Sequence, residues 1–336
     1  MSGLTRRELL SLGARAGLAA LGLGGLSACR RAPGRLETIV IQGAPSPPSL
    51  ALLRVAEQGV PKELADEARF MVWSTADEMR ARITSGQAHF SGVPTNVAAA
   101  LYNRGVPVQL LNAYIWGILY LVTSDPNLSS LADLRGQPVL IPFRGDLPDI
   151  LTQYLLRREG VEMTSFLQAN YVSTAPEAAQ LLASGRAAHA VLSEPSATLA
   201  ILKAKQNGIT LRRAVDYCDA WAQATGRPPR LPMAVVVADR TLAAERPAVL
   251  EWFQVAHREA VDWVIAHPDE ATRMGADVFE AIPAEAMRQS IPFIRFSFVE
   301  AQDARSEIEF FLSEMQSLSP ELIGGRLPPD EFYYQG

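Results

Sequence analysis

Apolar and polar positions follow the same order at two places along this chain. Residues 74–88 begin with Ser-Thr-Ala and end with Ser-Gly-Gln-Ala, while residues 173–187 begin with Ser-Thr-Ala and end with Ser-Gly-Arg-Ala. The offset is 99 residues, and seven of the fifteen positions are identical. An apolar run of strand length, 70–73, precedes the first copy. This repetition predicts one α/β unit used twice, with simple fold periodicity as the alternative.

Each copy reads as a strand, a capped helix and a second strand. In the first copy Ser74 or Thr75 can cap a helix whose Glu78 closes a capping box. Gly86 and Gly185 supply the positive-φ turn that ends each helix. A strand, a helix and a strand at this spacing pair in parallel through a right-handed crossover.

The pattern as a whole predicts an α/β fold of two similar lobes. Ligands of open α/β sheets bind outside the carboxyl ends of the strands. Two lobes whose strand ends face each other therefore form a cleft. Other predicted strands include 38–41, 139–143 and 232–238, and other predicted helices include 49–58, 247–266 and 306–315.

The first 28 residues have the features of an export signal. Arg6 and Arg7 precede an apolar stretch at 16–26, which is shorter than the roughly 20 residues that a membrane-spanning helix needs. Residues 26–29, Leu-Ser-Ala-Cys, form a lipobox, which predicts cleavage before Cys29 and a diacylglycerol on its thiol. The arginine pair favours twin-arginine export, and an ordinary secretory signal is the alternative. We expect a periplasmic or extracytoplasmic protein attached to a membrane by its lipid.

Charge and cysteine content narrow the class of partner. The formal net charge is −5, and it becomes −7 when residues 1–28 are removed with their three arginines and one glutamate. An acidic protein of this kind is a poor partner for nucleic acid. Cys218 has no partner once Cys29 is acylated, so no disulfide is expected. The four histidines are too scattered for a metal site, and no cofactor is predicted.

Loops after the predicted strands carry the candidate ligand contacts of the first lobe. Pro45 and Ser46 lie in the turn after the first strand, and Ser74 follows the second strand. Thr95 and Asn96 follow the third. Ser74, Thr95 and Asn96 can cap the helices that begin there, and a capping hydroxyl beside a cleft can also reach a ligand.

An aromatic pair, Tyr114 and Trp116, lies where the chain is expected to leave the first lobe. Their spacing of two residues puts both rings on one face of a strand. Such a pair packs in a core or forms the wall of a pocket. Both interpretations remain open from the sequence.

The second lobe offers a possible anion site at the start of a helix. Gly145 allows the backbone to approach a ligand closely, and the amides of a helix start favour an anion. Arg144 is placed to hold such an anion through its guanidinium. The alternative is a surface ion pair between Arg144 and Asp146 or Asp149.

Three further polar residues follow strands of the second lobe. Ser173 and Thr174 repeat the places of Ser74 and Thr75 in the first lobe, and Glu194 stands 99 residues after Thr95. The carboxylate of Glu194 can accept a hydrogen bond from a ligand amine or ring N–H, or it can cap the next helix. The candidate ligand-binding residues are Pro45, Ser46, Ser74, Thr95, Asn96, Tyr114, Trp116, Arg144, Gly145, Ser173, Thr174 and Glu194.

Four segments together resemble a known family. These are Ser-Gly-Gln-Ala-His-Phe at 85–90, Leu-Ala-Asp-Leu-Arg-Gly-Gln-Pro-Val at 131–139, Ser-Glu-Pro at 193–195, and the late helical stretch 259–271. Across nearly all of the mature chain this pattern resembles the solute-binding proteins of ABC importers. The resemblance is to the nitrate, sulfonate and taurine group, which includes binders of aliphatic sulfonates and thiamine precursors.

The resemblance implies a fold of the periplasmic binding protein type II kind, with two α/β lobes, a hinge and a central ligand cleft. It implies a monomer that captures a sulfonate-, carboxylate- or pyrimidine-like solute and delivers it to a membrane permease and its ATPase, without catalysis. The expected boundaries are a signal peptide at 1–28, a tether at 29–36, a first lobe at 37–123 and 231–336, and a second lobe at 124–230.

Two other functions use the same fold. One is a sensory or partner-binding lipoprotein. The other is an enzyme like the pyrimidine-precursor synthases, which needs a reactive loop rich in His and Cys that this sequence lacks. The chain also departs from its family, which often has Gly-Ser or Gly-Thr where this sequence has Gly145 and Asp146. An acidic Asp146 beside Glu194 argues against a simple oxyanion as the ligand.

Overall fold

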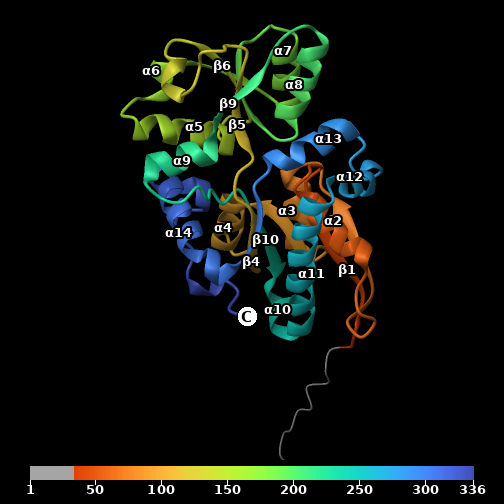
Figure 1. Cartoon of the computed structure of the whole chain (residues 1–336). Coiled ribbons are helices and arrows are strands. Elements are labelled where there is room, and N and C mark those ends of the chain that lie inside the picture. Colours follow the sequence, from red (N-terminus) through yellow and green to blue (C-terminus); the bar gives the residue numbers. More distant parts are fainter. Residues whose placement is uncertain (1–33) are drawn as a thin grey trace, which may run out of the picture. The chain divides into compact units, whose positions relative to one another are not determined.

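Two mixed β-sheets, each covered by helices, make up the part of the chain that the structure describes (Figure 1). This computed structural model describes residues 34–336. The predicted signal peptide and the predicted lipid-bearing Cys29 lie outside that range. Residues 35–336 cluster as one unit, and we call the six-stranded sheet with its helices the first lobe and the five-stranded sheet with its helices the second lobe.

The first sheet has the strand order β11-β4-β10-β3-β1-β2. Strand β1 pairs in parallel with β2 and with β3, and β10 is antiparallel to both β3 and β4. The elements of the first lobe are β1 (Leu36–Gly43), α2 (Ser49–Gln58), β2 (Ala65–Val72), α3 (Ala76–Thr84), β3 (Phe90–Pro94), α4 (Thr95–Asn103), β4 (Val108–Ile115), β10 (Ala234–Asp239), α10 (Arg240–Glu245), α11 (Pro247–Ala266), α12 (Pro268–Ala276), α13 (Ala284–Ser290), η2 (Ile291–Phe293), β11 (Phe296–Glu300), α14 (Ala301–Leu318), η3 (Pro320–Ile323) and η4 (Asp330–Phe332).

The second sheet has the order β7-β6-β8-β5-β9. Here β6 pairs in parallel with β7 and β8, while β5 is antiparallel to β8 and β9. The elements are β5 (Leu119–Thr123), η1 (Leu131–Leu134), β6 (Pro138–Pro142), α5 (Leu147–Arg158), α6 (Met163–Phe166), β7 (Gln168–Val172), α7 (Ala175–Ala183), β8 (His189–Ser193), α8 (Ser196–Gln206), β9 (Arg212–Asp216) and α9 (Tyr217–Thr225).

The 99-residue repeat corresponds to equivalent places in the two sheets. In the first sheet β1 lies between β3 and β2, and in the second sheet β6 lies between β8 and β7. The repeated segment begins after β2 in one lobe and after β7 in the other, and it forms α3 and α7. The prediction of one α/β unit used twice is therefore confirmed.

Helix periodicity explains why the longest helix lies against the first sheet. The buried side chains of α11 recur every three or four residues along its length. They are Val249, Leu250, Phe253, Ala256, His257, Ala260, Val261 and Val264. The helix bounds agree with the predicted range 247–266, and α2 agrees in the same way with the predicted range 49–58.

The strand β5 lies in the second sheet, whereas the predicted lobe boundary placed residues up to 123 in the first lobe. Leu119 is opposite Ser193 of β8, and Thr123 is opposite His189. The side chain of Thr123 is also hydrogen-bonded to the ring of His189 at 2.8 Å. The chain thus leaves the first sheet directly after β4, because residues 116–118 are the short link between β4 and β5.

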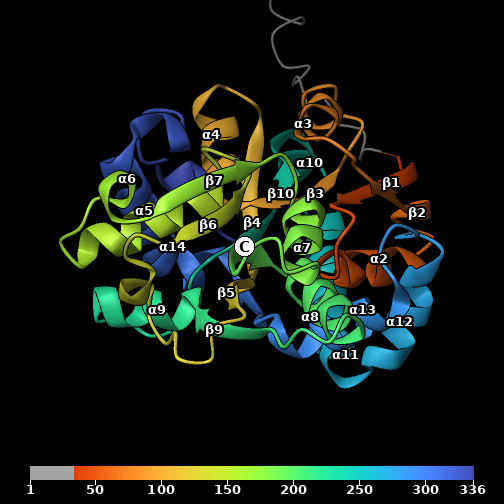
Figure 2. The ribbon, with the colours of Figure 1, turned by 90° about the horizontal axis from the view of Figure 1, so that it is seen from above.

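The apolar core continues from one lobe into the other. One cluster of buried side chains includes the first sheet, its helices, and the α5 and α9 side of the second lobe. Trp221 of α9 packs with Tyr154 of α5 at 4.9 Å between ring centroids, and with Phe310 and Phe311 of α14 at 5.7 and 5.9 Å. A second cluster lies around α7 and α8. Figures 1 and 2 show α14 next to α5 and α9, and α13 next to α8.

Helices that could cross a bilayer are absent from residues 34–336, since none there is both long and apolar enough.

Candidate functional site

The carboxyl ends of the parallel strands lie at the facing edges of the two sheets. β4 runs parallel to β3, because both are antiparallel to β10. Three residues separate the end of β4 from the start of β5, a link that spans at most about 11 Å. β5 is antiparallel to β8, so the end of β8 lies beside the start of β5. The ends of β1–β3 and of β6–β8 are therefore the edges where ligands of open α/β sheets bind.

Three segments meet where the chain passes between the sheets. The amide of Leu231, on the return crossing, donates to the carbonyl of Trp116 at 3.1 Å. Arg295 lies between η2 and β11, and its amide donates to the carbonyl of Gly117 at 2.8 Å. The amide of Trp116 donates in turn to the carbonyl of Arg295 at 2.8 Å. The crossings are thus held side by side by backbone hydrogen bonds.

Both copies of the repeated helix are capped by their own side chains. The amide of Glu78 donates to the hydroxyl of Thr75 at 3.1 Å, and the amide of Ser74 donates to the carboxylate of Glu78 at 2.7 Å. Of Ser74 and Thr75, the two candidate caps in the sequence, Thr75 is therefore the cap. Ser74 remains exposed, and its amide is already used.

The second copy has the same capping arrangement. The amide of Glu177 donates to the hydroxyl of Thr174 at 3.2 Å, and the amide of Ser173 donates to Glu177 at 3.0 Å. Thr174 thus has the capping role that Thr75 has in the first lobe. The exposed side chain of Ser173 lies at the edge of the second sheet.

The other candidates of the first lobe differ in their accessibility. Thr95 is fully buried, and its hydroxyl donates to the carbonyl of Pro232 at 2.7 Å, which fixes the return crossing to α4. Asn96 is 7% exposed, with its amide 3.5 Å from the carbonyl of Leu322. Pro45 is exposed and Ser46 half-buried, in the turn before α2. Of these loop candidates, Pro45 and Ser74 are exposed, Ser46 is half-buried, and Thr95 and Asn96 are buried.

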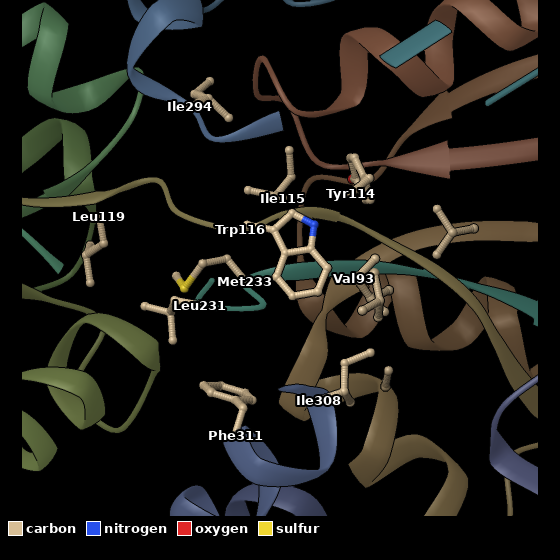
Figure 3. Packing of buried hydrophobic residues seen from close by; sticks show 14 of the residues in the cluster. Val93, Tyr114, Ile115, Trp116, Leu119, Leu231, Met233, Ile294, Ile308 and Phe311 are labelled. Carbon is tan, nitrogen blue, oxygen red and sulfur yellow. The ribbon is translucent and has the colours of Figure 1, made fainter. Parts of the chain in front are cut away.

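Tyr114 and Trp116 are core residues in this structure (Figure 3). Tyr114 is 2% exposed and packs edge-to-face against the ring of His257, with centroids 5.0 Å apart. Trp116 is 3% exposed, and its indole N–H donates to the carbonyl of Ser297 at 2.7 Å. The guanidinium of Arg230 covers the Trp116 ring at 4.1 Å. Of the two interpretations of this pair, the structure favours core packing.

Arg144 is exposed at the carboxyl end of β6 and lies over the ring of Tyr171, 4.9 Å from its centroid. The carboxylate of Asp149 accepts hydrogen bonds from the amide of Gly145 at 2.8 Å and from the hydroxyl of Tyr171 at 3.1 Å. No ion pair within residues 34–336 includes Arg144. The alternative of an ion pair with Asp146 or Asp149 is therefore not what the structure has.

The carboxyl of Asp146, in the turn that carries Arg144, has a shifted pKa. Burial raises the pKa of the Asp146 carboxyl, and the guanidinium of Arg80 opposes this by lowering it. Arg80 belongs to α3, at the edge of the first lobe.

Glu194 is 2% exposed and bonded within its own lobe. One carboxylate oxygen accepts from the amide of Thr198 at 3.1 Å and from its hydroxyl at 2.7 Å, and the other lies 2.5 Å from the guanidinium of Arg213. Burial raises the pKa of Glu194, and the positive charge of Arg213 opposes the shift. Glu194 thus caps α8. The positive charge of Arg213 balances the negative charge of Glu194. Glu194 and Asp146 together therefore repel an anionic ligand less than the sequence alone suggests.

Two aromatic residues at the facing edges are missing from the predicted set. Trp73 follows β2, and its indole nitrogen is buried without a hydrogen-bond partner among the described residues. Phe143 follows β6 and is 42% exposed with a φ of 59°. The sequence shows both only as the last apolar residue of a predicted strand. The sequence could have indicated a role for both, because Trp73 directly precedes Ser74 and Phe143 directly precedes Arg144, and both of these were candidate ligand contacts.

Cys218 is buried and unpaired, as expected for a packed small side chain. Its Sγ donates to the carbonyl of Trp116 at 3.0 Å, and burial raises the pKa of the thiol to about 11. A thiol in this state is a poor nucleophile.

A separate hollow of about 240 Å³ lies beside β4 and α11, and none of the predicted site residues lines it. Glu251, Gln254 and Tyr334 are among the side chains that surround it.

Within the described residues, no group of three or more His, Cys, Asp or Glu side chains is arranged to hold a metal ion.

Solved structures share this architecture over most of the chain. A crystal structure of an ABC transporter from Parabacteroides distasonis is 25% identical with a TM-score of 0.74, over 89% of this chain and 99% of that one. The periplasmic aliphatic sulphonate binding protein SsuA from Escherichia coli is 15% identical with a TM-score of 0.67, over 89% and 92%. The periplasmic nitrate-binding protein NrtA from Synechocystis PCC 6803 is 14% identical with a TM-score of 0.59, over 85% and 82%.

These likenesses confirm the predicted fold class, a two-lobe α/β fold of the type II periplasmic binding protein kind. No curated protein matches the sequence. A family model described as NMT1/THI5 like matches residues 75–271, which include parts of both lobes. That match covers more than half of the chain, and the chain therefore belongs to the NMT1/THI5-like family.

Proposed function

We propose that this protein is the solute-binding component of an ABC importer. In this proposal it captures a small sulfonate or carboxylate between its two lobes and delivers it to a membrane permease and its ATPase. Its family and its likeness to solved ABC-import binding proteins support this role. The solute leaves unchanged, so incubation with the protein should give no product.

The observation that carries the anionic solute class is the state of Arg144. It lies at the start of α5, whose N-cap residue Asp146 makes no capping hydrogen bond through its side chain. The Arg144 guanidinium lies over the Tyr171 ring and has no carboxylate partner among residues 34–336. A helix start and a guanidinium together favour an anion, because the helix amides and the forked N–H groups donate to different oxygens.

Identification of the solute begins with thermal-shift measurements on the mature protein. A compound that binds the folded state raises its apparent stability in proportion to RT ln(1 + [L]/Kd). Sulfonates, aromatic acids, zwitterions and pyrimidines make up the panel. We expect shifts from sulfonates or carboxylates. A shift from neutral pyrimidines alone would contradict the anionic class.

Replacement of Arg144 tests where the acid group binds. Arg144→Ala should weaken binding of the selected anion by about 2 to 4 kcal/mol, the scale of truncating one member of a charge pair. Arg144→Lys should restore little, because an ammonium cannot donate two parallel hydrogen bonds. Isothermal titration calorimetry on the three proteins gives the affinities.

Arg135 provides a matched control for this substitution. It is also exposed and covers an aromatic ring, that of Phe166, at 4.6 Å. It precedes β6, however, so it lies at the opposite end of the strand from Arg144. Arg135→Ala should leave the affinity unchanged. Equal affinities in the wild type and both Arg144 variants would mean that the anion binds elsewhere.

The proposal includes attachment to a membrane through lipid on Cys29, as the lipobox at 26–29 predicts. Export through the twin-arginine route is part of the same proposal and rests on Arg6 and Arg7. A lipid anchor keeps the binding protein near its permease.

A further inference from the structure

Phe143 combines two features that are each unfavourable to the folded state. Its φ of 59° is the only positive value for a residue other than glycine in the described part of the chain. A left-handed conformation is unfavourable for a bulky residue, because its Cβ comes too close to the following carbonyl oxygen. The side chain is also 42% exposed, so most of its potential for apolar burial is unused.

The surroundings hold this conformation in place. The amide of Phe143 donates to the carbonyl of Val172 on β7 at 3.2 Å, and its own carbonyl accepts from the amide of Asp146 at 2.9 Å. The buried carboxylate of Asp149 then fixes the amide of Gly145 at 2.8 Å. A turn bonded at so many points imposes its geometry on Phe143. Folding alone does not explain the phenyl ring, since glycine or asparagine fits this φ better.

The turn lies where a solute would be recognised. It follows the carboxyl end of β6, the edge of the sheet at which ligands of open α/β sheets bind. Phe143 directly precedes Arg144, which carries the proposed anion contact. On the first-lobe edge Trp73 adds a second aromatic side chain, whose indole N–H has no acceptor within residues 34–336.

We propose that Phe143 determines specificity by contacting an apolar body of the solute while Arg144 holds its acid group. The solute class is then an aryl or similarly bulky apolar sulfonate or carboxylate, as opposed to an inorganic or two-carbon anion. This inference rests on the proposed function, because it assumes that an anionic solute binds between the lobes. Aromatic contact with an apolar group is favourable through buried area and through the geometry of ring pairs.

Two sulfonates that differ in their apolar part test the inference. Calorimetry with 4-toluenesulfonate and ethanesulfonate should show that the wild type prefers the aryl compound by about tenfold or more, the scale of a well-filled apolar pocket. Phe143→Gly and Phe143→Asn should each lose most of that preference, with little change for ethanesulfonate. Phe143→Leu, which keeps apolar bulk, should retain part of it.

The melting temperature of the same variants is a second measurement. It should stay the same or rise, whereas the preference for the aryl compound should fall. Because glycine and asparagine accept a positive φ, both variants should melt at the wild-type temperature or above it. A clear fall in melting temperature would mean that the ring stabilises the fold, and would overturn the inference. Leu327→Asn, at a side chain that is 40% exposed in the first lobe, serves as the control and should change neither affinity.

The outcomes distinguish a failure of the role proposed for Phe143 from a failure of the proposed solute-binding function. Binding of both sulfonates with equal affinity, unaffected by Phe143, would overturn the role of Phe143 and leave the proposed function standing. If the wild type binds neither these sulfonates nor any acid of the thermal-shift panel, both proposals fail together.

Discussion

His257 is fully buried on α11 among the rings of Tyr114, Phe253 and Phe298. Neither of its ring nitrogens has a hydrogen-bond partner among the described residues. Burial lowers the pKa of this imidazole from 6.5 to about 3, since a positive charge is not tolerated in this environment. The pKa values of His89 and His189 are also lowered, mainly by burial. The folded protein therefore contains histidines that resist protonation.

The pH dependence of stability follows from these shifts. Between pH 6.5 and about 3 the unfolded chain binds a proton at residue 257 and the folded chain does not, so the free energy of unfolding falls as the pH falls. One such group contributes a slope of at most about 1.4 kcal/mol per pH unit. His257→Leu should remove this contribution, as measured by urea unfolding at several pH values. His267→Leu changes an exposed histidine and should keep the wild-type slope.

Short-range chemistry was predictable for single residues, and long-range pairing was not. The sequence identifies the cap of the first repeated helix, because Thr75 and Glu78 lie within one helical turn. It does not identify Arg213 as the partner of Glu194, because Glu194 follows β8 while Arg213 lies on β9, and the two meet only in the folded sheet. It also offers no sign that Phe143 has a positive φ, since no glycine or asparagine stands there.

At the scale of elements, a short segment of the first lobe reaches onto the second. This segment, residues 291–295, follows α13 and precedes β11. The hydroxyl of Tyr120 on β5 donates to the carbonyl of Phe293 at 2.6 Å, and the guanidinium of Arg213 lies 3.5 Å from the Phe293 ring centroid. Arg295 binds Asp216 and Asp219, each at 2.8 Å. The segment 291–295 therefore limits how far the lobes can separate.

Removal of Arg295 should loosen this restraint. Arg295→Ala breaks two charge-assisted hydrogen bonds between the lobes, and we expect a loss of about 1 to 3 kcal/mol in stability. We also expect a larger radius of gyration in small-angle scattering of the protein without solute. The loss of stability is measured by urea unfolding.

The control uses an arginine with the same bonding pattern inside one lobe. Arg305 binds Glu309 at 2.7 Å and Asp330 at 2.5 Å, and its side chain is 30% exposed against 33% for Arg295. Arg305→Ala should lower stability without expanding the molecule. If both variants leave the radius of gyration unchanged, the segment 291–295 does not restrain the lobes.

Elements with strong periodicity were predicted well, and membership of a sheet was less predictable. The bounds of α2 and α11 follow from their apolar spacing and from the residues that flank them. The predicted first lobe at 37–123 wrongly included β5, because the antiparallel pairing of β5 with β8 in the second sheet leaves no local pattern in the sequence. The last long helix, α14, begins five residues before its predicted start, since its first turn contains small and polar residues.

At the scale of the whole molecule, the proposed lipid anchor on Cys29 would determine where the protein acts. If Cys29 carries the lipid, Cys29→Ala should release the protein from the membrane fraction or leave it uncleaved. Fractionation of cells with immunodetection distinguishes these forms. Cys218→Ala removes the other cysteine and should remain attached to the membrane. A processed Cys29→Ala protein that stays in the membrane fraction would contradict the anchor.

The repeat made the two-lobe plan predictable, because equivalent strands and helices of both lobes carry the same capping signals. The joining of the lobes was not predictable in the same way. Trp221 and Phe311 are 90 residues apart and lie in different lobes, yet they share one core. Such contacts depend on the placement of whole helices, which no local pattern records.

The paired crossings have a consequence for recombination between relatives. The second lobe is an insertion whose entry at 116–118 and exit near Leu231 lie side by side, joined by the hydrogen bond from Leu231 to Trp116. Genetic exchange of the interval between them would substitute a complete five-stranded unit without displacing the ends of the recipient. The aromatic contact of Trp221 with Phe310 and Phe311 restricts such exchange. A transplanted second lobe must carry a side chain that packs against α14 as Trp221 does. Where it does, the recipient protein can gain the solute specificity of the donor in a single exchange.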